Sequence, residues 1–180
     1  LESWEWTFST TRRYPRRMTA YPSYESASAL LAETKARGFK IATAESCTGG
    51  LIVASLAAIP GASASLERGF VTYSNEAKTE MLGVPVDLIQ RLGAVSRDVA
   101  IAMAEGAIGK SRADISVAVT GIAGPDGGTA EKPVGLVHLA ASRRNGATIH
   151  EEKRFGDLGR RQIQLATVQA AFDLLKRVMD

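Results

Sequence analysis

The sequence predicts an α/β protein, a three-layer α/β/α sandwich with a mixed, mainly parallel sheet. Segments of helical and of strand periodicity alternate along the chain, and a single β-hairpin interrupts the alternation near its end. A continuous run of β-branched and small apolar residues at 115–120 is typical of a central strand covered on both faces. The 180 residues are 45% hydrophobic and 23% charged, values expected for a globular domain with one core.

Helix and strand alternate in the first half of the chain. A helix is predicted over residues 24–37, where Ser23 can cap the start and Gly38 can end the helix in a left-handed conformation. The next predicted segments are a strand at 39–44, a loop at 45–50, an apolar helical run at 51–59, a strand at 69–73 and a helix that Asn75 caps and that runs to about Leu82.

The second half continues this alternation and then turns back on itself. Strands are predicted at 134–142 and 148–155, because Asn145-Gly146 between them favours a tight hairpin turn. The other predicted segments are a short helix at 85–92, a helix at 97–109 capped by Ser96, the strand at 115–120, a Gly- and Pro-rich loop at 121–128 and a final amphipathic helix that Asp157 can cap.

The amino-terminal residues differ from the rest in composition. Residues 1–17 carry four arginines and two glutamates, and so account for +2 of the net charge of +3. Met18 resembles an internal start, so residues 1–20 are expected to be a leader or peripheral arm and residues 21–180 a single domain. A targeting segment and a nucleic-acid arm are the alternatives for the leader. The nearly balanced charge of the remainder argues against nucleic acid or a membrane as the main partner.

Cysteine and histidine are scarce. Cys47 is the one cysteine and His138 and His150 are the two histidines, so neither an internal disulfide nor a cysteine-based zinc site is possible. This composition favours a reducing, cytoplasmic compartment and predicts no metal and no cofactor, since the nucleotide-binding glycine motifs are also missing. A thiolate at a helix start would be a reactive nucleophile, and packing in the core is the alternative for Cys47.

Loops at the carboxyl ends of strands are where open α/β sheets bind ligands. The first such loop contains Ser46 and Thr48, and then Gly49 and Gly50 open a helix. Free amides and the helix dipole at such a turn can hold a phosphate or the oxyanion of acyl transfer. The alternative is structural: Glu45 and Ser46 cap the helix, and the glycines allow close packing.

The second loop and the helix after it place Tyr73, Asn75 and Lys78 within six residues. A serine nucleophile needs a base, and with histidine scarce a desolvated lysine is the available candidate. Tyr73 could relay the proton or orient the pair. A solvated surface lysine is the alternative.

The third loop, residues 120–129, is rich in glycine. Gly121 and Gly124 would let backbone amides approach a ligand closely, and Thr120 could add a hydroxyl to a phosphate or ribose. A mobile surface loop is the alternative.

Four motifs occur together in this order: TAESCTGG at 43–50, VTYSNEAK at 71–78, VTGIAGPDGGT at 119–129 and KPVGLV at 132–137. Through them the chain resembles the CinA C-terminal domain family over residues 23–180. The resemblance implies hydrolysis of nicotinamide mononucleotide to nicotinic acid mononucleotide and ammonia, a step of pyridine nucleotide salvage. Larger members carry a further N-terminal domain, so the chain is expected to be the single-domain form.

The resemblance also implies roles for individual residues. Ser46 would be the nucleophile, Lys78 the general base and Tyr73 the residue that positions or relays the proton. The residues expected to bind substrate are Thr48, Gly49, Gly50, Asn75, Thr120, Gly121, Gly124 and Arg160. The family's Gly-Asp-Arg before the last helix is displaced here to Gly156-Asp157-Leu158-Gly159-Arg160, so Arg160 is the candidate phosphate contact and Arg161 its alternative.

Two other functions stay open: a non-catalytic regulatory or binding module linked to competence or DNA damage, and an amidase for another small amide. Ser46, Tyr73 and Lys78 together favour the enzyme, because a pure binding domain has no need of all three. A homo-oligomer is expected, since the family tends to self-associate and the apolar stretch 51–66 could be buried between subunits.

Overall fold

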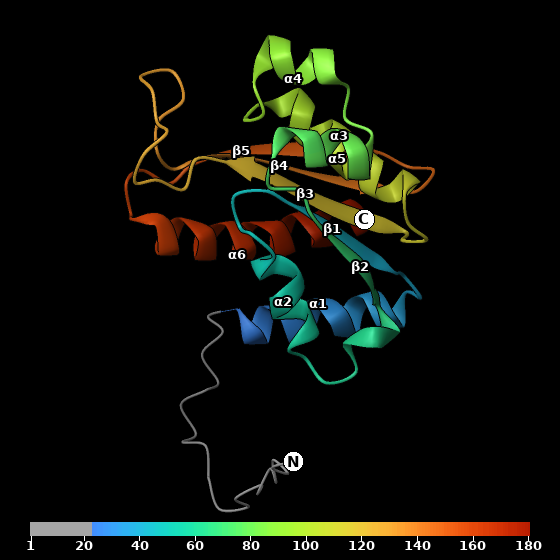
Figure 1. Ribbon diagram of the computed structural model, residues 1–180. Helices are drawn as coiled ribbons and strands as arrows, with labels where there is room; N and C mark the ends of the chain where they lie inside the picture. The colour runs from blue at the N-terminus through green and yellow to red at the C-terminus, as the bar shows by residue number, and fades with distance from the viewer. Residues whose placement is uncertain (1–22) are drawn as a thin grey trace, which may run out of the picture.

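A computed structural model describes residues 23–180 and confirms the predicted three-layer α/β/α sandwich (Figure 1). The predicted leader, residues 1–20, lies outside the described residues. The sheet has five strands in the order β2-β1-β3-β4-β5. Their bounds are β1 Ile41–Glu45, β2 Leu66–Val71, β3 Ile115–Gly121, β4 Leu136–Arg143 and β5 Thr148–Arg154.

The sheet is mixed and mainly parallel, as predicted. Strand β1 pairs in parallel with β2 and β3, whereas β4 is antiparallel to both β3 and β5, so β4 alone runs in the opposite direction. Glu45, the last residue of β1, pairs with Val71 of β2 and Val119 of β3. The segments that follow these three strands therefore leave the sheet at one edge.

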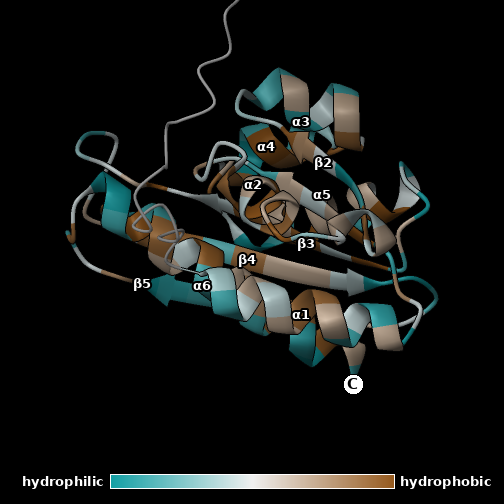
Figure 2. Cartoon of the chain, turned by 90° about the horizontal axis from the view of Figure 1, so that it is seen from below, coloured by the Kyte–Doolittle hydropathy of each residue, from teal (hydrophilic) through white to brown (hydrophobic). Residues whose placement is uncertain are grey.

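Helices cover both faces of the sheet. Below it in Figure 1 lie α1 (Tyr24–Ala36), α2 (Leu51–Ala57) and α6 (Arg160–Met179), and above it lie α3 (Asn75–Leu82), α4 (Val86–Leu92) and α5 (Arg97–Gly109). Figure 2 shows α1 and α6 from below, beside the hydrophilic edge strand β5. A short 3-10 turn, η2 (Ala62–Ala64), connects α2 to β2.

The two faces of the sheet differ in side-chain size. The face that packs against α6 presents mainly branched residues, including Ile115, Val117 and Leu139. The face that packs against α5 presents a row of alanines: Ala42, Ala44, Ala118 and Ala140. Small side chains let α5 lie close to the strands. Gly106 of α5 lies directly against α3, since a Cβ there would overlap the backbone of Leu82.

The apolar stretch 51–66 is buried in part, and Ala54, Ala57 and Ala58 are exposed. Ile52, Leu56, Ile59 and Ala62 are all buried in the cluster on the α6 side. The expected subunit interface therefore stays a prediction.

Several predicted boundaries and caps need correction. Strand β2 begins at Leu66, three residues before the predicted strand, because the charged Glu67 and Arg68 of this edge strand hide its pattern. Ser74, not Asn75, caps α3 by accepting the Ala77 N–H at 3.1 Å. Asp157 does not cap α6, whose N-cap is Gly159.

The remaining predicted caps have mixed outcomes. Ser23 and Ser96 occupy the predicted N-cap positions, but neither side chain makes a capping hydrogen bond to a described residue. Gly38 adopts φ 69° after α1, as predicted. Within residues 23–180, no helix combines the length and apolar composition needed to cross a membrane.

Candidate active site

Segments from four parts of the chain meet beyond the carboxyl ends of β1, β2 and β3. They are the loop 46–50, the segment 72–74, the loop 122–124 and the start of α6. In Figure 1 the long loop after β3 extends at the left, above the beginning of α6. Hydrogen bonds from side chains to other side chains and to the backbone join these segments into one site.

Ser46 and Lys78 are in direct contact at its centre. The Lys78 Nζ lies 3.1 Å from the Ser46 Oγ, and Lys78 is only 1% exposed. Lys78 stands in the second turn of α3, and helical side chains lean toward the helix start. Its amine therefore reaches back to the segment before the helix and donates to the carbonyls of Thr72 at 2.9 Å, Tyr73 at 3.3 Å and Ser74 at 3.3 Å. The alternative of a solvated surface lysine is wrong.

The Lys78 amine is suited to gain and lose a proton. Burial lowers the pKa of Lys78 below its ordinary 10.5, and the nearby Glu76 carboxylate acts in the opposite direction. An ammonium has three N–H donors, which match the three carbonyls. A neutral amine has a lone pair that can accept the Ser46 O–H, while its two N–H groups stay bonded to carbonyls.

Glu45 holds the loop 46–50 at the start of α2. Its fully buried carboxylate accepts hydrogen bonds from the hydroxyls of Thr43 and Thr48 and from the backbone N–H groups of Gly50, Ile52 and Val53. The structural alternative for this loop is thus confirmed for Glu45, which caps α2. The start of α2 is already occupied by the chain's own anion.

Two backbone amides of the loop 46–50 remain available. The Gly49 N–H donates to the Ser46 carbonyl at 3.0 Å, whereas the N–H groups of Cys47 and Thr48 have no acceptor among residues 23–180. Gly49 and Gly50 have φ values of 61° and 98°, which glycine adopts without strain. The loop thus presents free donors directly after Ser46.

Cys47 packs in the core, which was the alternative to a reactive thiolate. It is 6% exposed, and burial raises the pKa of the Cys47 thiol to about 12. The thiol is therefore protonated at neutral pH and carries no charge that could act on Lys78.

Arg160 joins the second and third loops. Its guanidinium donates to the Tyr73 hydroxyl at 2.9 Å and to the Gly124 carbonyl at 3.0 Å. The Tyr73 side chain is 60% exposed, so its ring and the guanidinium lie at the surface of the site. Arg161 makes no such contact with any described residue.

Gln164, one turn after Arg160, was not predicted from the sequence. Its side-chain amide donates to the Cys47 carbonyl at 3.0 Å. The two residues are 117 positions apart, and no local pattern marks a glutamine within an amphipathic helix for such a role.

Other predicted binding residues have contacts of their own. The buried Thr120 hydroxyl donates to the Ala94 carbonyl at 2.9 Å, and the Thr48 hydroxyl donates to Glu45 at 2.7 Å. Gly121 pairs with Val137 in the sheet and leaves no room for a Cβ. The structure therefore unites Ser46 and Lys78, and Arg160 with Tyr73 and Gly124, but points the hydroxyls of Thr48 and Thr120 into the protein.

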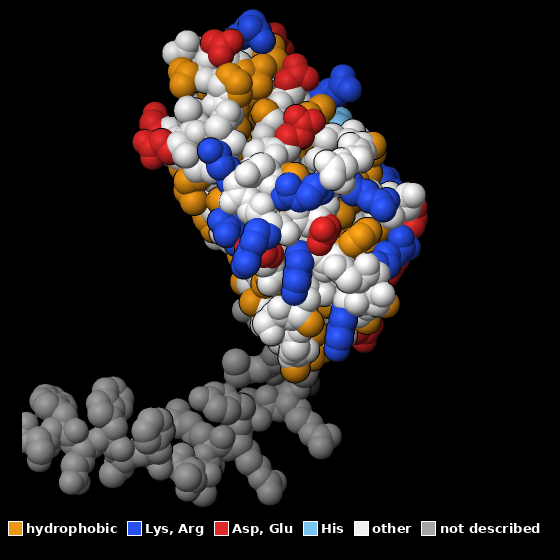
Figure 3. All heavy atoms as spheres, turned by 90° about the vertical axis from the view of Figure 1, so that its right-hand side faces the viewer, with side chains coloured by type: hydrophobic (Ala, Val, Ile, Leu, Met, Phe, Trp, Pro, Cys, Tyr) orange, Lys and Arg blue, Asp and Glu red, His pale blue; other side chains and the backbone are white. Residues whose placement is uncertain are grey.

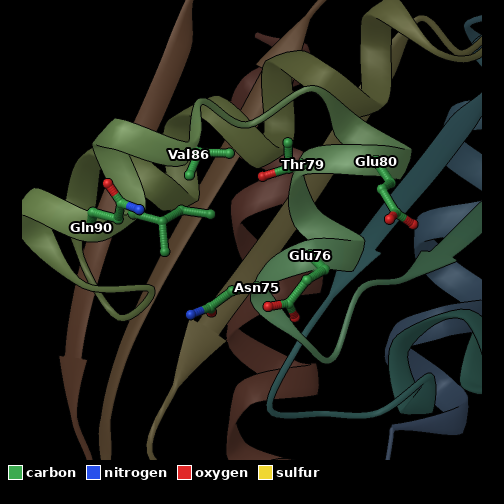
Figure 4. A pocket seen from close by; sticks show the side chains of 7 residues that line it. Asn75, Glu76, Thr79, Glu80, Val86 and Gln90 are labelled. Carbon is green, nitrogen blue, oxygen red and sulfur yellow. The ribbon is translucent and has the colours of Figure 1, made fainter.

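Asn75 lines a groove on another side of α3 (Figure 4). The groove has a volume of about 360 Å³ and lies between α3 and α4; Glu76, Thr79, Glu80, Val86, Ile89 and Gln90 complete its lining. Lys78 and Leu82 are the buried residues of α3 and face elsewhere. Within residues 23–180, no group of three or more His, Cys, Asp or Glu side chains is placed to hold a metal ion.

The chain is thus an α/β/α domain in which a serine hydroxyl and a buried lysine amine are in contact at the carboxyl ends of the strands. The chain belongs to the CinA family: the model of the CinA C-terminal domain matches residues 23–179.

Curated relatives agree with this assignment. The chain is 52% identical over 140 residues to a CinA-like protein of Geotalea uraniireducens, which covers 78% of the chain and 33% of the relative. It is 53% identical over 137 residues to a putative competence-damage inducible protein of Acetivibrio thermocellus, over 76% of the chain and 33% of the relative. The chain therefore spans about a third of the length of these relatives.

Solved structures have the same fold. The competence/damage inducible protein CihA of Agrobacterium tumefaciens is 53% identical, with a TM-score of 0.86 over 87% of this chain and 95% of that one. A CinA superfamily protein of Escherichia coli is 34% identical, with a TM-score of 0.81 over 86% of this chain and 89% of that one.

Proposed function

We propose that the chain is an amidohydrolase in which Ser46 is the nucleophile and Lys78 the general base, and that it hydrolyses nicotinamide mononucleotide to nicotinic acid mononucleotide and ammonia. The observation that carries the proposal is the 3.1 Å approach of the buried Lys78 amine to the Ser46 hydroxyl. A nucleophile within hydrogen-bond reach of its base, at the edge where α/β sheets bind ligands, is the arrangement that acyl transfer needs. The substrate follows from the family resemblance.

The first half of the reaction forms an acyl-enzyme. Neutral Lys78 takes the Ser46 proton as Oγ attacks the carboxamide carbon, and the oxyanion accepts hydrogen bonds from the free amides of Cys47 and Thr48. Lys78 then gives its proton to the departing nitrogen, the C–N bond breaks and ammonia leaves. The product stays bound to Ser46 as an ester.

The second half repeats these steps with water. Lys78 takes a proton from water as the water oxygen attacks the ester carbon, and the same amides bind the second oxyanion. The C–Oγ bond breaks, Ser46 regains its proton and the carboxylate product is released. One water is consumed and one ammonia formed in each cycle.

Arg160 supports a substrate with an anionic group. Its guanidinium lies beside the exposed Tyr73 ring, so a phosphate and a planar ring could be bound next to each other. We propose Arg160 as the phosphate contact. Glu45 excludes the start of α2 from this role.

The test is ammonia release from nicotinamide mononucleotide by the purified protein, with nicotinamide and glutamine as control substrates. Ser46→Ala is the blank, and Ser111→Ala is the matched control, because the Ser111 hydroxyl bonds only to the backbone of Ala107 and Ala113. Release confined to the mononucleotide, lost in Ser46→Ala and kept in Ser111→Ala, is expected. A folded protein that releases no ammonia from it would refute the proposed substrate.

A regulatory or binding module is the second candidate function, because the names of several relatives refer to competence and damage. Figure 3 shows Lys and Arg side chains gathered over the middle of one face, with Asp and Glu among them. Several arginines of the chain are already paired: Arg68 and Arg112 with Glu67, and Arg144 with three carbonyls.

An amidase for another small amide is the third candidate, and the same assay with a panel of amides detects it.

The proposal includes the setting of the enzyme. We propose a cytoplasmic homo-oligomer whose partner is a small-molecule substrate rather than nucleic acid or a membrane. Light scattering tests the oligomeric state, and binding assays with duplex DNA and lipid vesicles test the two exclusions.

A further inference from the structure

Helix α6 contacts the candidate active site through two side chains on one face. Arg160 and Gln164 are four residues apart and therefore neighbours on the helix surface. Arg160 binds Tyr73 and Gly124, whereas Gln164 donates to the Cys47 carbonyl at 3.0 Å. Gln164 is half-buried and is thus partly shielded from water.

The Gln164 contact determines the direction of a neighbouring N–H group. In a trans peptide the carbonyl and the following N–H lie in one plane and point in opposite directions. With the Cys47 carbonyl held toward α6, the Thr48 N–H must point away from α6. This N–H has no acceptor among the described residues.

The same loop is held on its other side by Glu45. That carboxylate accepts the Thr48 hydroxyl and the Gly50 N–H, so it fixes the residues just after the Cys47–Thr48 peptide. Gln164 fixes the peptide itself. Donors held in place before the reaction stabilise a developing charge without any cost of reorganisation.

We propose that Gln164 is a positioning residue: through the Cys47 carbonyl it aims the Thr48 N–H at the oxyanion that forms after attack by Ser46. The inference rests on the proposed amidohydrolase function and adds a residue to it. Gln164 touches neither Ser46 nor Lys78 and acts through the peptide that it holds.

The experiment compares Gln164→Leu with Gln169→Leu. Gln169 lies on the same helix, is half-buried like Gln164 and bonds only to Asp173, so it is a matched control. Loss of one direct oxyanion donor lowers kcat by about 10²–10³-fold, and a misdirected donor should lower it roughly tenfold or more. We expect Gln164→Leu to lower kcat of nicotinamide mononucleotide hydrolysis with little change in KM, and Gln169→Leu to behave as wild type.

Gln164→Glu adds a readout that a merely structural role would not change. The introduced carboxyl has nearly the shape of the amide but can donate to the Cys47 carbonyl only when protonated. The ratio of variant to wild-type kcat should therefore rise as pH falls. A ratio that does not vary with pH, or Gln164→Leu kinetics equal to those of Gln169→Leu, would overturn the inference.

A fluorophosphonate probe separates this inference from the proposed substrate. The probe labels an activated serine and leaves a phosphonyl oxygen in the oxyanion position, whatever amide the enzyme hydrolyses. Labelling of Ser46 that slows in Gln164→Leu but not in Gln169→Leu, without hydrolysis of the mononucleotide, would refute the substrate and support the role of Gln164. Equal hydrolysis of the mononucleotide by wild type and both variants would support the proposed substrate and refute the role of Gln164. Absence of both hydrolysis and labelling would refute the substrate and the role together.

Discussion

Gly106→Ala should destabilise the protein, although alanine normally favours a helix. A glycine-to-alanine change inside a helix contributes about 0.5–1 kcal/mol of stability. Here the new Cβ would lie 3.0 Å from both the carbonyl carbon and the Cβ of Leu82, and still closer to the Leu82 carbonyl oxygen. Non-bonded heavy atoms are best placed about 3.5–4.0 Å apart, so α5 and α3 must separate by roughly 1 Å.

The expected loss of stability is the difference between the overpacking cost and the gain in helix propensity. Overpacking of a tight core costs about 1–3 kcal/mol, and a rigid backbone neighbour places this site at the upper end. After subtraction of the helix term, the net loss is about 2 kcal/mol, which in a domain of this length lowers Tm by about 4–8 °C. Since α3 carries Lys78, a displacement of about 1 Å should also lower kcat by up to roughly 10²-fold.

Thermal unfolding followed by circular dichroism measures the stability, and ammonia release measures the activity. Gly109→Ala is the control, because Gly109 ends the same helix and has no atom within 4 Å of an added Cβ. Its Tm should stay unchanged or rise slightly. A Tm of Gly106→Ala at or above that of wild type would refute the close-packing argument.

Three further predictions concern the Ser46–Lys78 pair. Lys78→Met should lower kcat by about 10²–10⁴-fold, the usual contribution of a general base, as measured by ammonia release; a change confined to KM would make Lys78 a binding residue. Because burial lowers the pKa of Lys78, kcat/KM should rise with pH as the amine becomes neutral and should level off above that lowered pKa. The free energy of unfolding should rise with pH between the lowered pKa and 10.5, because in this pH range the unfolded chain binds more protons than the folded protein. Cys47→Ala should keep wild-type turnover, because burial raises the pKa of the thiol to about 12; a loss equal to that of Ser46→Ala would make the thiol the nucleophile.

Much of the fold was predictable because its signals are local. The strand 115–120 and the hairpin at Asn145-Gly146 were identified from apolar content and turn residues alone. The start of β2 is not predicted because Glu67 and Arg68 are charged residues of an edge strand and interrupt its apolar pattern. The cap of α6 was assigned to Asp157, but the chain runs two residues further before Gly159, at φ 81°, begins the helix.

The candidate site was predictable to the extent that it follows strand ends. The rule that ligand sites gather at the carboxyl edge selected the segments of Ser46, Lys78 and Gly124, which the structure brings to one place. Side-chain direction was not predictable in this way, so Thr48 and Thr120 were expected at the ligand although their hydroxyls point into the protein. Gln164 depends on how α6 docks, which no short pattern encodes.

The contacts of α6 divide the candidate site into a part that forms early in folding and a part that forms late. Ser46 and Lys78 are 32 residues apart, whereas Arg160 and Gln164 reach partners that precede them by 87 and 117 residues. Distant contacts form late in folding, because a long loop must close first. Ser46 and Lys78, the proposed nucleophile and base, can therefore meet in a growing chain that still lacks the proposed oxyanion support and phosphate contact. A form from which α6 has detached would keep most of its helical signal and lose turnover, so hydrolysis would report the docking of this helix more sensitively than circular dichroism.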